Sequence, residues 1–234
     1  MNKDQIKTNI DKIRENIKEA ALRGGRNPDD VLLVAVTKTR TPEEINAAID
    51  AGITDIGENK VQELLDKYDK VKNVRWHMIG HLQTNKVKYI IDKVALIHSV
   101  DSIKLAQEIN KRAEQHNKIM DVLIQINIAG EESKFGIVPE ETEQRIREIL
   151  ENCSNVRIRG LMSMVPFVED PETVRGYFAE MTNLYRKCGA IEHERLDFRC
   201  LSMGMSNDYQ VAIEEGANVV RLGTSIFGER NYNQ

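Results

Sequence analysis

The segment Val31-Leu32-Leu33-Val34-Ala35-Val36-Thr37-Lys38-Thr39 places six consecutive apolar residues just before a lysine. An unbroken run of this kind is typical of a strand that is buried on both faces, as in a parallel sheet. Side chains alternate along a strand, so Lys38 is expected to point the same way as Val34 and Val36. Its amine then lies either at a functional rim of the sheet or simply in water at the strand end.

Strand-like and helix-like segments alternate along the rest of the chain. A helical pattern covers residues 4–23, and Thr41-Pro42-Glu43-Glu44 predicts a capping box at the start of the next helix. Further helices include a lysine-rich one after Asn85 and one that Ser206 caps and that runs to Glu215. Further strands are expected at residues 53–57, 74–79, 94–100, 122–128, 156–164, 199–203 and 219–222.

This alternation predicts the fold class. About eight βα units in 234 residues match an α/β protein of the (β/α)8 TIM-type barrel class with an extra N-terminal helix, formed by one domain over residues 1–234. An open doubly wound sheet is the alternative, but no GxGxxG motif follows the first strand.

Composition excludes several classes of protein. The net charge of −4 argues against a nucleic-acid binder, and no apolar run reaches the roughly 18 residues of a membrane span. The N-terminus has no secretory signal, and the three cysteines (Cys153, Cys188, Cys200) are widely spaced without a CxxC motif. We therefore expect a cytoplasmic protein without disulfides, membrane contact or nucleic-acid partner.

In a barrel, functional groups collect where strands end, and the last two such junctions are the most informative. Ser206 follows one strand at the start of a predicted helix, and Gly223-Thr224 follows the last strand. Both loops offer backbone N–H groups and hydroxyls to an anion, although ordinary capping explains either one alone. Arg221 lies on the last strand and faces inward with Val219, so it requires either an ion-pair partner or a ligand.

Two other groups of residues are weaker candidates. His77 and His81 are four residues apart, but no third ligand has convincing spacing, so a structural role is favoured over zinc. Lys134 lies in a polar loop among carboxylates and is expected to be solvated. No metal site is predicted.

An amine, an anion cradle and an inward arginine together suit a phosphorylated aldehyde held as a Schiff base. Desolvation lowers the pKa of a lysine and makes its amine more nucleophilic. Pyridoxal 5′-phosphate (PLP) fits these parts, and a sugar phosphate of the class I aldolase type would fit them too.

Several longer motifs extend this constellation over nearly the whole chain. They are Val34-Ala35-Val36-Thr37-Lys38, Gly57-Glu58-Asn59-Lys60-Val61-Gln62-Glu63, Trp76 to Lys86, Ile97 to Asp101, Leu201 to Ser206, and Val220 to Gly228. In these motifs the chain resembles the YggS/PROSC family, barrel proteins that bind PLP in vitamin B6 homeostasis and are related to the N-terminal domain of alanine racemase. The resemblance implies a barrel like that of PLP fold type III.

The resemblance also implies roles for individual residues. Lys38 resembles the lysine that forms the Schiff base, and Arg221 resembles the guanidinium at the pyridine nitrogen. Asn59 resembles the residue near the ring hydroxyl. The expected phosphate contacts are Ser206, Gly223, Thr224 and the backbone of Met205.

The resemblance further implies a PLP-binding homeostasis protein without robust catalysis, which stores the cofactor or delivers it to apo forms of PLP-dependent enzymes. A charged donor at the ring nitrogen weakens the ring as an electron sink. In alanine racemase a tyrosine from an additional β domain supplies a second acid/base, and we expect no such domain here, which favours a monomer. A weak amino-acid racemase is the alternative, and a Schiff-base aldolase is the third possibility.

Overall fold

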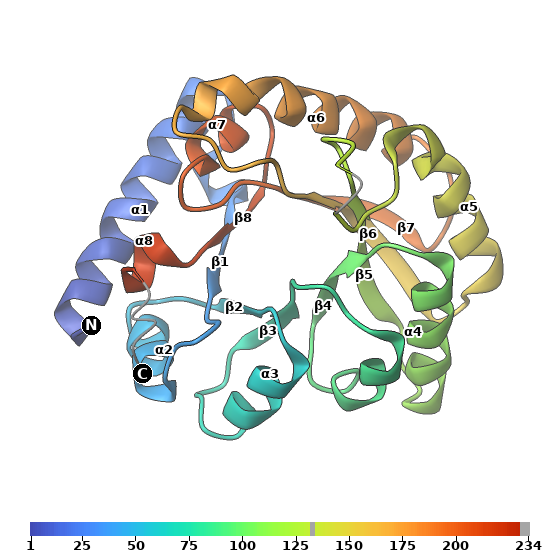
Figure 1. Cartoon of the computed structure of the whole chain (residues 1–234), viewed down its shortest axis with the longest axis horizontal. Coiled ribbons are helices and arrows are strands. Elements are labelled where there is room, and N and C mark those ends of the chain that lie inside the picture. Colours follow the sequence, from blue (N-terminus) through green and yellow to red (C-terminus); the bar gives the residue numbers. More distant parts are fainter. Residues whose placement is uncertain (132–133, 230–234) are drawn as a thin grey trace.

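The computed structural model describes residues 1–131 and 134–229. Within these residues, eight parallel strands close into a barrel in sequence order, with β8 paired to β1 (Figure 1). The strands are β1 (Leu32–Val36), β2 (Asp55–Glu58), β3 (Arg75–Met78), β4 (Leu96–Val100), β5 (Met120–Ile126), β6 (Val156–Ser163), β7 (Leu196–Ser202) and β8 (Val219–Leu222). The predicted barrel is therefore confirmed.

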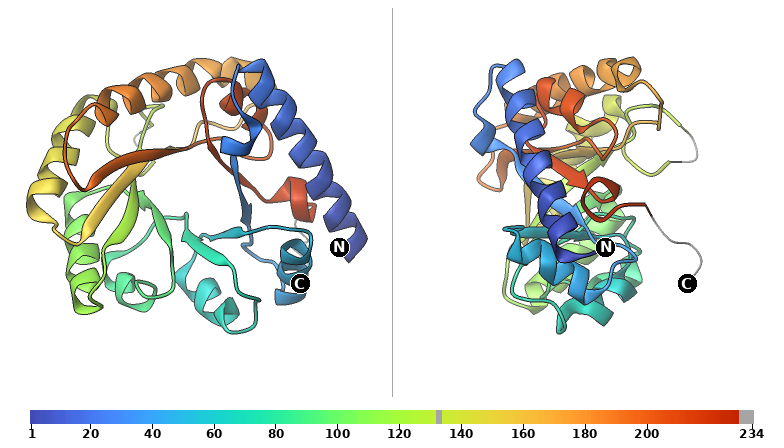
Figure 2. Two further views of the ribbon diagram at one scale, coloured as in Figure 1. Left: turned by 180° about the vertical axis from the view of Figure 1, so that it is seen from behind. Right: turned by 90° about the vertical axis from the view of Figure 1, so that its left-hand side faces the viewer.

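Helices surround the strands in one outer layer (Figures 1 and 2). The α-helices are α1 (Lys3–Arg23), α2 (Pro42–Asp50), α3 (Val61–Tyr68), α4 (Ile103–Gln115), α5 (Thr142–Asn152), α6 (Arg175–Gly189), α7 (Tyr209–Glu214) and α8 (Thr224–Phe227). Short 3₁₀ helices are η1 (Pro28–Asp30), η2 (Thr84–Tyr89), η3 (Pro139–Glu141) and η4 (Pro171–Val174). No helix in the described part of the chain is both long and apolar enough to cross a membrane.

The N-terminal helix α1 covers the place where the barrel closes. Four isoleucines and two alanines at helical spacing form its buried face: Ile6, Ile10, Ile13, Ile17, Ala20 and Ala21. The helix contacts α2, α7 and α8, and it lies outside β1 and β8 (Figure 1). Because α8 has only four residues, the extra helix shields the β8–β1 seam that a longer last helix would cover.

Local signals in the sequence set several element boundaries. The capping box predicted at Thr41 is present, since its side chain accepts the Glu44 N–H and Glu44 accepts the Thr41 N–H. The lysine-rich helix predicted after Asn85 is wrong in type, because residues 84–89 form the 3₁₀ helix η2. The seventh strand starts at Leu196, three residues earlier than its apolar run indicates.

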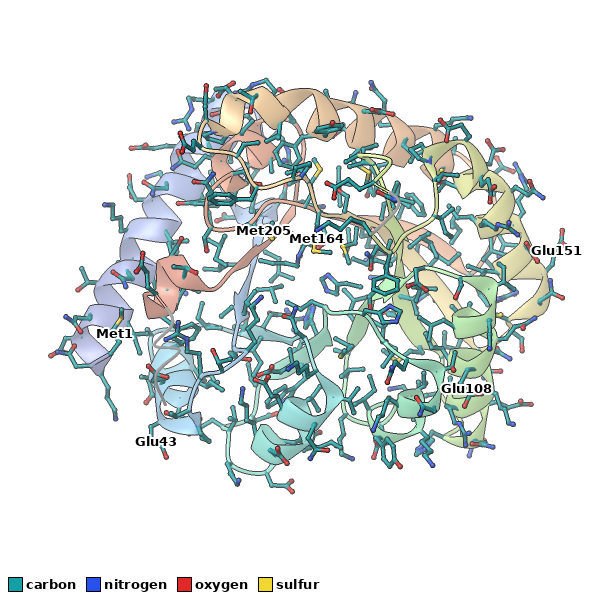
Figure 3. The ribbon with its side chains drawn as sticks, viewed as in Figure 1. Met1, Glu43, Glu108, Glu151, Met164 and Met205 are labelled. Atoms are coloured by element: carbon teal, nitrogen blue, oxygen red, sulfur yellow. The ribbon has the colours of Figure 1, made fainter. Side chains whose placement is uncertain are left out.

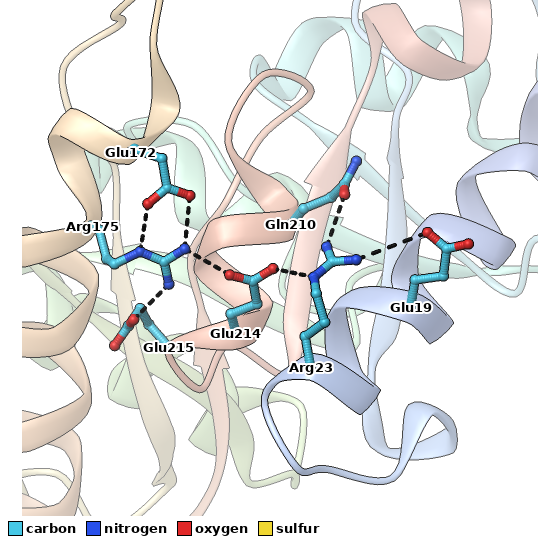
Figure 4. A network of polar contacts seen from close by, with 7 residues as sticks. All are labelled: Glu19, Arg23, Glu172, Arg175, Gln210, Glu214 and Glu215. Atoms are coloured by element: carbon cyan, nitrogen blue, oxygen red, sulfur yellow. Dashed lines mark hydrogen bonds and ion pairs between the residues drawn. The ribbon is translucent and has the colours of Figure 1, made fainter.

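An ion-pair network ties α6, α7 and α1 together on the outside of the barrel (Figure 4). Glu214 of α7 accepts from Arg175 of α6 and from Arg23 of α1, both at 2.7 Å. Arg175 also contacts two further carboxylates, which raise its pKa. The remaining members are Glu19, Glu172, Gln210 and Glu215. The network fixes α7, the helix that follows the loop containing Ser206.

Candidate functional site

An open cavity of about 650 Å³ lies at the carboxyl ends of the barrel strands. This volume is within the range of small-molecule sites, roughly 300–1,000 Å³. The structure brings every predicted site residue to its wall: Lys38, Asn59, Met205, Ser206, Arg221, Gly223 and Thr224. Met205 and Met164, which are labelled in Figure 3, both line the cavity.

Lys38 reaches the cavity from just beyond the end of β1. Val36, the last residue of that strand, lines the same wall, as the strand parity predicts. Thr37 between them is fully buried and continues the pairing with β2, since its N–H donates to Gly57 O at 3.0 Å. The lysine side chain is therefore supported by a rigid, buried backbone.

The Ser206 hydroxyl joins the two loops that were predicted to bind an anion. Its Oγ accepts the N–H groups of Gly223 and Ser225, each at 3.3 Å. The prediction that Ser206 caps the following helix is wrong, because α7 begins at Tyr209 and Asp208 is its N-cap. The Asp208 carboxylate accepts the Met205 N–H at 2.6 Å, and the Asp208 N–H donates to Met205 O at 3.1 Å, so the two residues close a turn that contains Ser206.

Arg221 is almost completely buried on β8, with an exposed fraction of 4%. Its guanidinium donates to the Ser202 hydroxyl and, at 2.8 Å, to the Ser163 carbonyl. Burial lowers the pKa of Arg221 to about 10, and Asp208 opposes that shift, so the group stays cationic at neutral pH. Both acceptors are uncharged, so the cation meets no directly bonded carboxylate in the described residues.

A chain of hydrogen bonds runs from Ser202 into the barrel interior. His98 Nδ1 lies 3.0 Å from the Ser202 hydroxyl, and His98 Nε2 lies 2.9 Å from His77 Nδ1. His77 Nε2 lies 2.9 Å from Asp55 Oδ1. With both histidines neutral, one arrangement satisfies every group: each donates from Nε2, and Ser202 donates to His98.

His77 is buried and hydrogen-bonded at both ring nitrogens, which supports a structural role. His81 lies apart from it at the surface, where it contacts Asp101 at 3.1 Å and stacks on Phe135. Among residues 1–131 and 134–229, no cluster of three metal-ligating side chains is present. Lys134 is exposed, as expected, but its neighbours 132–133 lie outside the described residues.

Asn59 follows β2, and the backbone of Gly80 packs tightly against it. A Cβ at Gly80 would lie 2.3 Å from Asn59 O, so only glycine allows this close approach. The Asn59 side-chain oxygen is buried and has no hydrogen-bond partner within the described residues. A buried amide oxygen without a donor is costly, which favours a ligand that supplies one.

Sequence reasoning missed part of the cavity wall. Arg40 lines it and is held by the Gly228 carbonyl at 2.6 Å, and Asp208 lines it with a pKa that burial raises. Phe167 and Met164 form an exposed apolar rim, with exposed fractions of 83% and 46%. Phe167 and Met164 follow the sixth strand, and this position in the sequence could have identified them, since loops after barrel strands line such cavities.

Comparisons with known proteins agree with this geometry. The model of the alanine racemase N-terminal domain family matches residues 5–231. A pyridoxal phosphate homeostasis protein of Aquifex aeolicus is 45% identical, with 95% of this chain and 97% of the relative covered. The structure of PipY from Synechococcus elongatus with PLP bound has a TM-score of 0.82 at 28% identity, covering 95% and 100% of the two chains. An alanine racemase of Clostridium difficile shares the fold, with a TM-score of 0.73 at 16% identity, 98% of this chain and 58% of the racemase chain being covered.

Proposed function

The chain belongs to the pyridoxal phosphate homeostasis protein family, and on this premise we propose that it binds PLP in the cavity at the strand ends. The observation that carries the proposal is the meeting of Lys38, Ser206 and Arg221 around one cavity of suitable size. The relative PipY has been solved with PLP bound, which supports the same assignment here.

The polar groups of the cavity match the polar groups of PLP. The Lys38 amine would hold the aldehyde carbon covalently, in a condensation that would replace the C=O bond by a C=N bond and release the oxygen as water. Ser206 with the Gly223 and Ser225 N–H groups would hold the phosphate, together with Thr224 and the backbone of Met205. Arg221 would donate to the ring nitrogen, and Asn59, with its unpartnered oxygen, would face the ring hydroxyl.

The protein stores or delivers the cofactor and is not a robust catalyst. A cationic guanidinium at the ring nitrogen disfavours protonation there, which limits the electron-withdrawing chemistry that PLP supplies to enzymes. Among the described residues of the cavity wall, none is a tyrosine or histidine that would serve as a second acid/base. The recipients would be apo forms of PLP-dependent enzymes.

One domain over residues 1–234 is enough for this function. We propose a monomer, and light scattering after size exclusion tests it. Cys153, Cys188 and Cys200 are free thiols, which supports a reducing, cytoplasmic location.

Absorbance with chemical trapping tests the proposal. Purified protein mixed with PLP should acquire a visible absorption band, and borohydride should bleach it and fix the cofactor to the peptide that contains Lys38. Lys38→Ala should abolish this labelling, whereas Lys72→Ala, at an exposed lysine, should not. A colourless protein would contradict the proposal. Rapid loss of the α-proton of L-alanine in deuterated water would instead support the racemase alternative.

A further inference from the structure

A buried lysine of α3, Lys67, lies close to the backbone next to Lys38. Lys67 of α3 is 8% exposed, and its ammonium contacts Glu58 Oε1 of β2 at 2.8 Å and Glu63 Oε2 at 3.2 Å. A third hydrogen bond, 2.8 Å long, joins it to the Thr37 carbonyl. We refer to Lys67, Glu58 and Glu63 as the Lys67 cluster.

The cluster holds the chain on both sides of Lys38. The Thr37 hydroxyl donates to Glu58 Oε1 at 2.7 Å, and the Thr39 N–H donates to Glu63 Oε2 at 2.7 Å. Thr39 has a φ of 63°, a left-handed conformation that a residue with a branched side chain rarely adopts without support. The residues immediately before and after Lys38 are therefore bonded to the same buried cluster.

Lys67 itself is not suited to react with an aldehyde. Its ammonium has three hydrogens, and the three oxygens that surround it accept all of them. It also lies outside the set of described residues that line the cavity. A purely structural ion pair between β2 and α3 would need only Glu58, and it would not need the contacts to Thr37 and Thr39.

We infer that Lys67 is a positioning residue for Lys38: with Glu58 and Glu63 it clamps the flanking backbone so that the Lys38 amine approaches the cofactor aldehyde. The inference rests on the proposed PLP function and deepens it. An amine already held at the aldehyde gives the condensation a high effective molarity, so a misplaced amine weakens covalent capture of PLP.

Comparing the binding of two ligands distinguishes a misplaced Lys38 amine from a general distortion of the cavity. PLP forms the bond to Lys38, whereas pyridoxine 5′-phosphate has the same ring and phosphate but an alcohol in place of the aldehyde. Lys67→Met should raise the dissociation constant for PLP about tenfold, as expected for a misplaced nucleophile, and leave that for pyridoxine 5′-phosphate nearly unchanged. The matched control is Lys118→Met, which removes another partly buried lysine bonded to a backbone carbonyl, that of Ile91.

Lys67→Met leaves Glu58 buried without its cation, which destabilises the fold, so a second variant is needed. The double variant Glu58→Gln/Lys67→Met removes both charges and should show the same selective loss of PLP binding. Glu63→Ala should also weaken PLP binding. Glu63→Gln should bind PLP more tightly than Glu63→Ala, because its amide oxygen still accepts the Thr39 N–H.

The outcomes are distinct. Selective loss of PLP binding in the Lys67 variants supports the inference. Equal weakening of both ligands, or wild-type affinity for PLP in the double variant, overturns it. A wild-type protein that binds pyridoxine 5′-phosphate but never forms a reducible bond at Lys38 would contradict the proposed function itself, and with it this role of Lys67.

Discussion

The imidazoles of His77 and His98 meet inside the barrel, with 2.9 Å between Nδ1 of His77 and Nε2 of His98. Burial is the main cause that lowers the pKa of His98 well below its usual value, and the nearby Arg221 guanidinium acts in the same direction. At the far end, hydrogen bonds from His77, Arg75 and Thr54 outweigh burial and lower the pKa of Asp55 to about 2. The barrel core therefore favours a neutral His98 and an ionised Asp55.

This arrangement makes stability depend on pH below neutrality. Above the unfolded-state pKa of about 6.5, neither state protonates His98; below it, the unfolded chain binds a proton that the folded chain does not. The free energy of unfolding should therefore fall as pH decreases, by up to about 1.4 kcal/mol per pH unit from this group. Urea unfolding at pH about 7.5 and about 5.5 measures this change in the free energy of unfolding, which should be smaller for His98→Gln than for the wild type.

The matched control for this experiment is His116→Gln, at an exposed histidine that follows α4. It should keep the wild-type dependence on pH. Asp55 does not interfere, because its stabilising contribution is lost only as pH falls below about 4 toward 2. A wild-type slope in His98→Gln would contradict a neutral, buried His98.

Ser202 and Ser99 offer a paired test of the hydrogen-bond chain. Both are fully buried, but the Ser202 hydroxyl contacts Arg221 and His98, whereas the Ser99 hydroxyl has no partner among the described residues. Ser202→Ala should destabilise the protein by about 1–3 kcal/mol, because two buried polar groups lose their partner. Ser99→Ala should be neutral or slightly stabilising. If thermal or urea unfolding showed the same loss of stability for both variants, the proposed hydrogen-bond chain through Ser202 would be contradicted.

Gly80 is predicted to be intolerant of substitution because of Asn59. A Cβ at Gly80 would lie 2.3 Å from Asn59 O and 2.7 Å from its Cα, so Gly80→Ala must move the Asn59 backbone. We expect a loss of about 1–3 kcal/mol in stability and weaker PLP binding. Gly176→Ala on α6 is the control, since a Cβ there meets no atom within 4 Å, and it should stabilise by about 0.5–1 kcal/mol. A folded Gly80→Ala variant with normal affinity would refute the steric argument.

The fold could be predicted from local patterns because each βα unit carries its own signals. The apolar run before Lys38 and the capping box at Thr41 are both present as predicted. The Ser206 cap was wrong because α7 begins at Tyr209, with Asp208 at the N-cap position, and Ser206 bonds instead to groups 17 and 19 residues away. Tertiary contacts override such a local capping signal, and they are not visible in a local pattern.

The buried residues that hold the cavity-lining residues in place were much less predictable from the sequence than the lining residues themselves. Lys38 and Arg221 were recognised by their positions at strand ends, which topology determines. The contact of His98 with Ser202 joins residues that are 104 positions apart. The contact of Glu58 with Lys67 joins strand β2 to helix α3. Spacing in sequence carries no information about such pairs, so only the three-dimensional structure identifies them.

Ser206 provides a direct test of the phosphate assignment. Its hydroxyl lies where the N–H groups of Gly223 and Ser225 converge, so Ser206→Ala removes a group that would bond the phosphate of PLP. A hydrogen bond to a charged group contributes about 1.5–3 kcal/mol, so the dissociation constant for PLP should rise roughly tenfold to a hundredfold. Pyridoxal, which lacks the phosphate, should bind wild type and variant alike, and Ser154→Ala, at an exposed serine, should change neither ligand. Absorbance titrations measure all six combinations of protein and ligand, and equal weakening of pyridoxal and PLP binding in Ser206→Ala would place the phosphate elsewhere in the cavity.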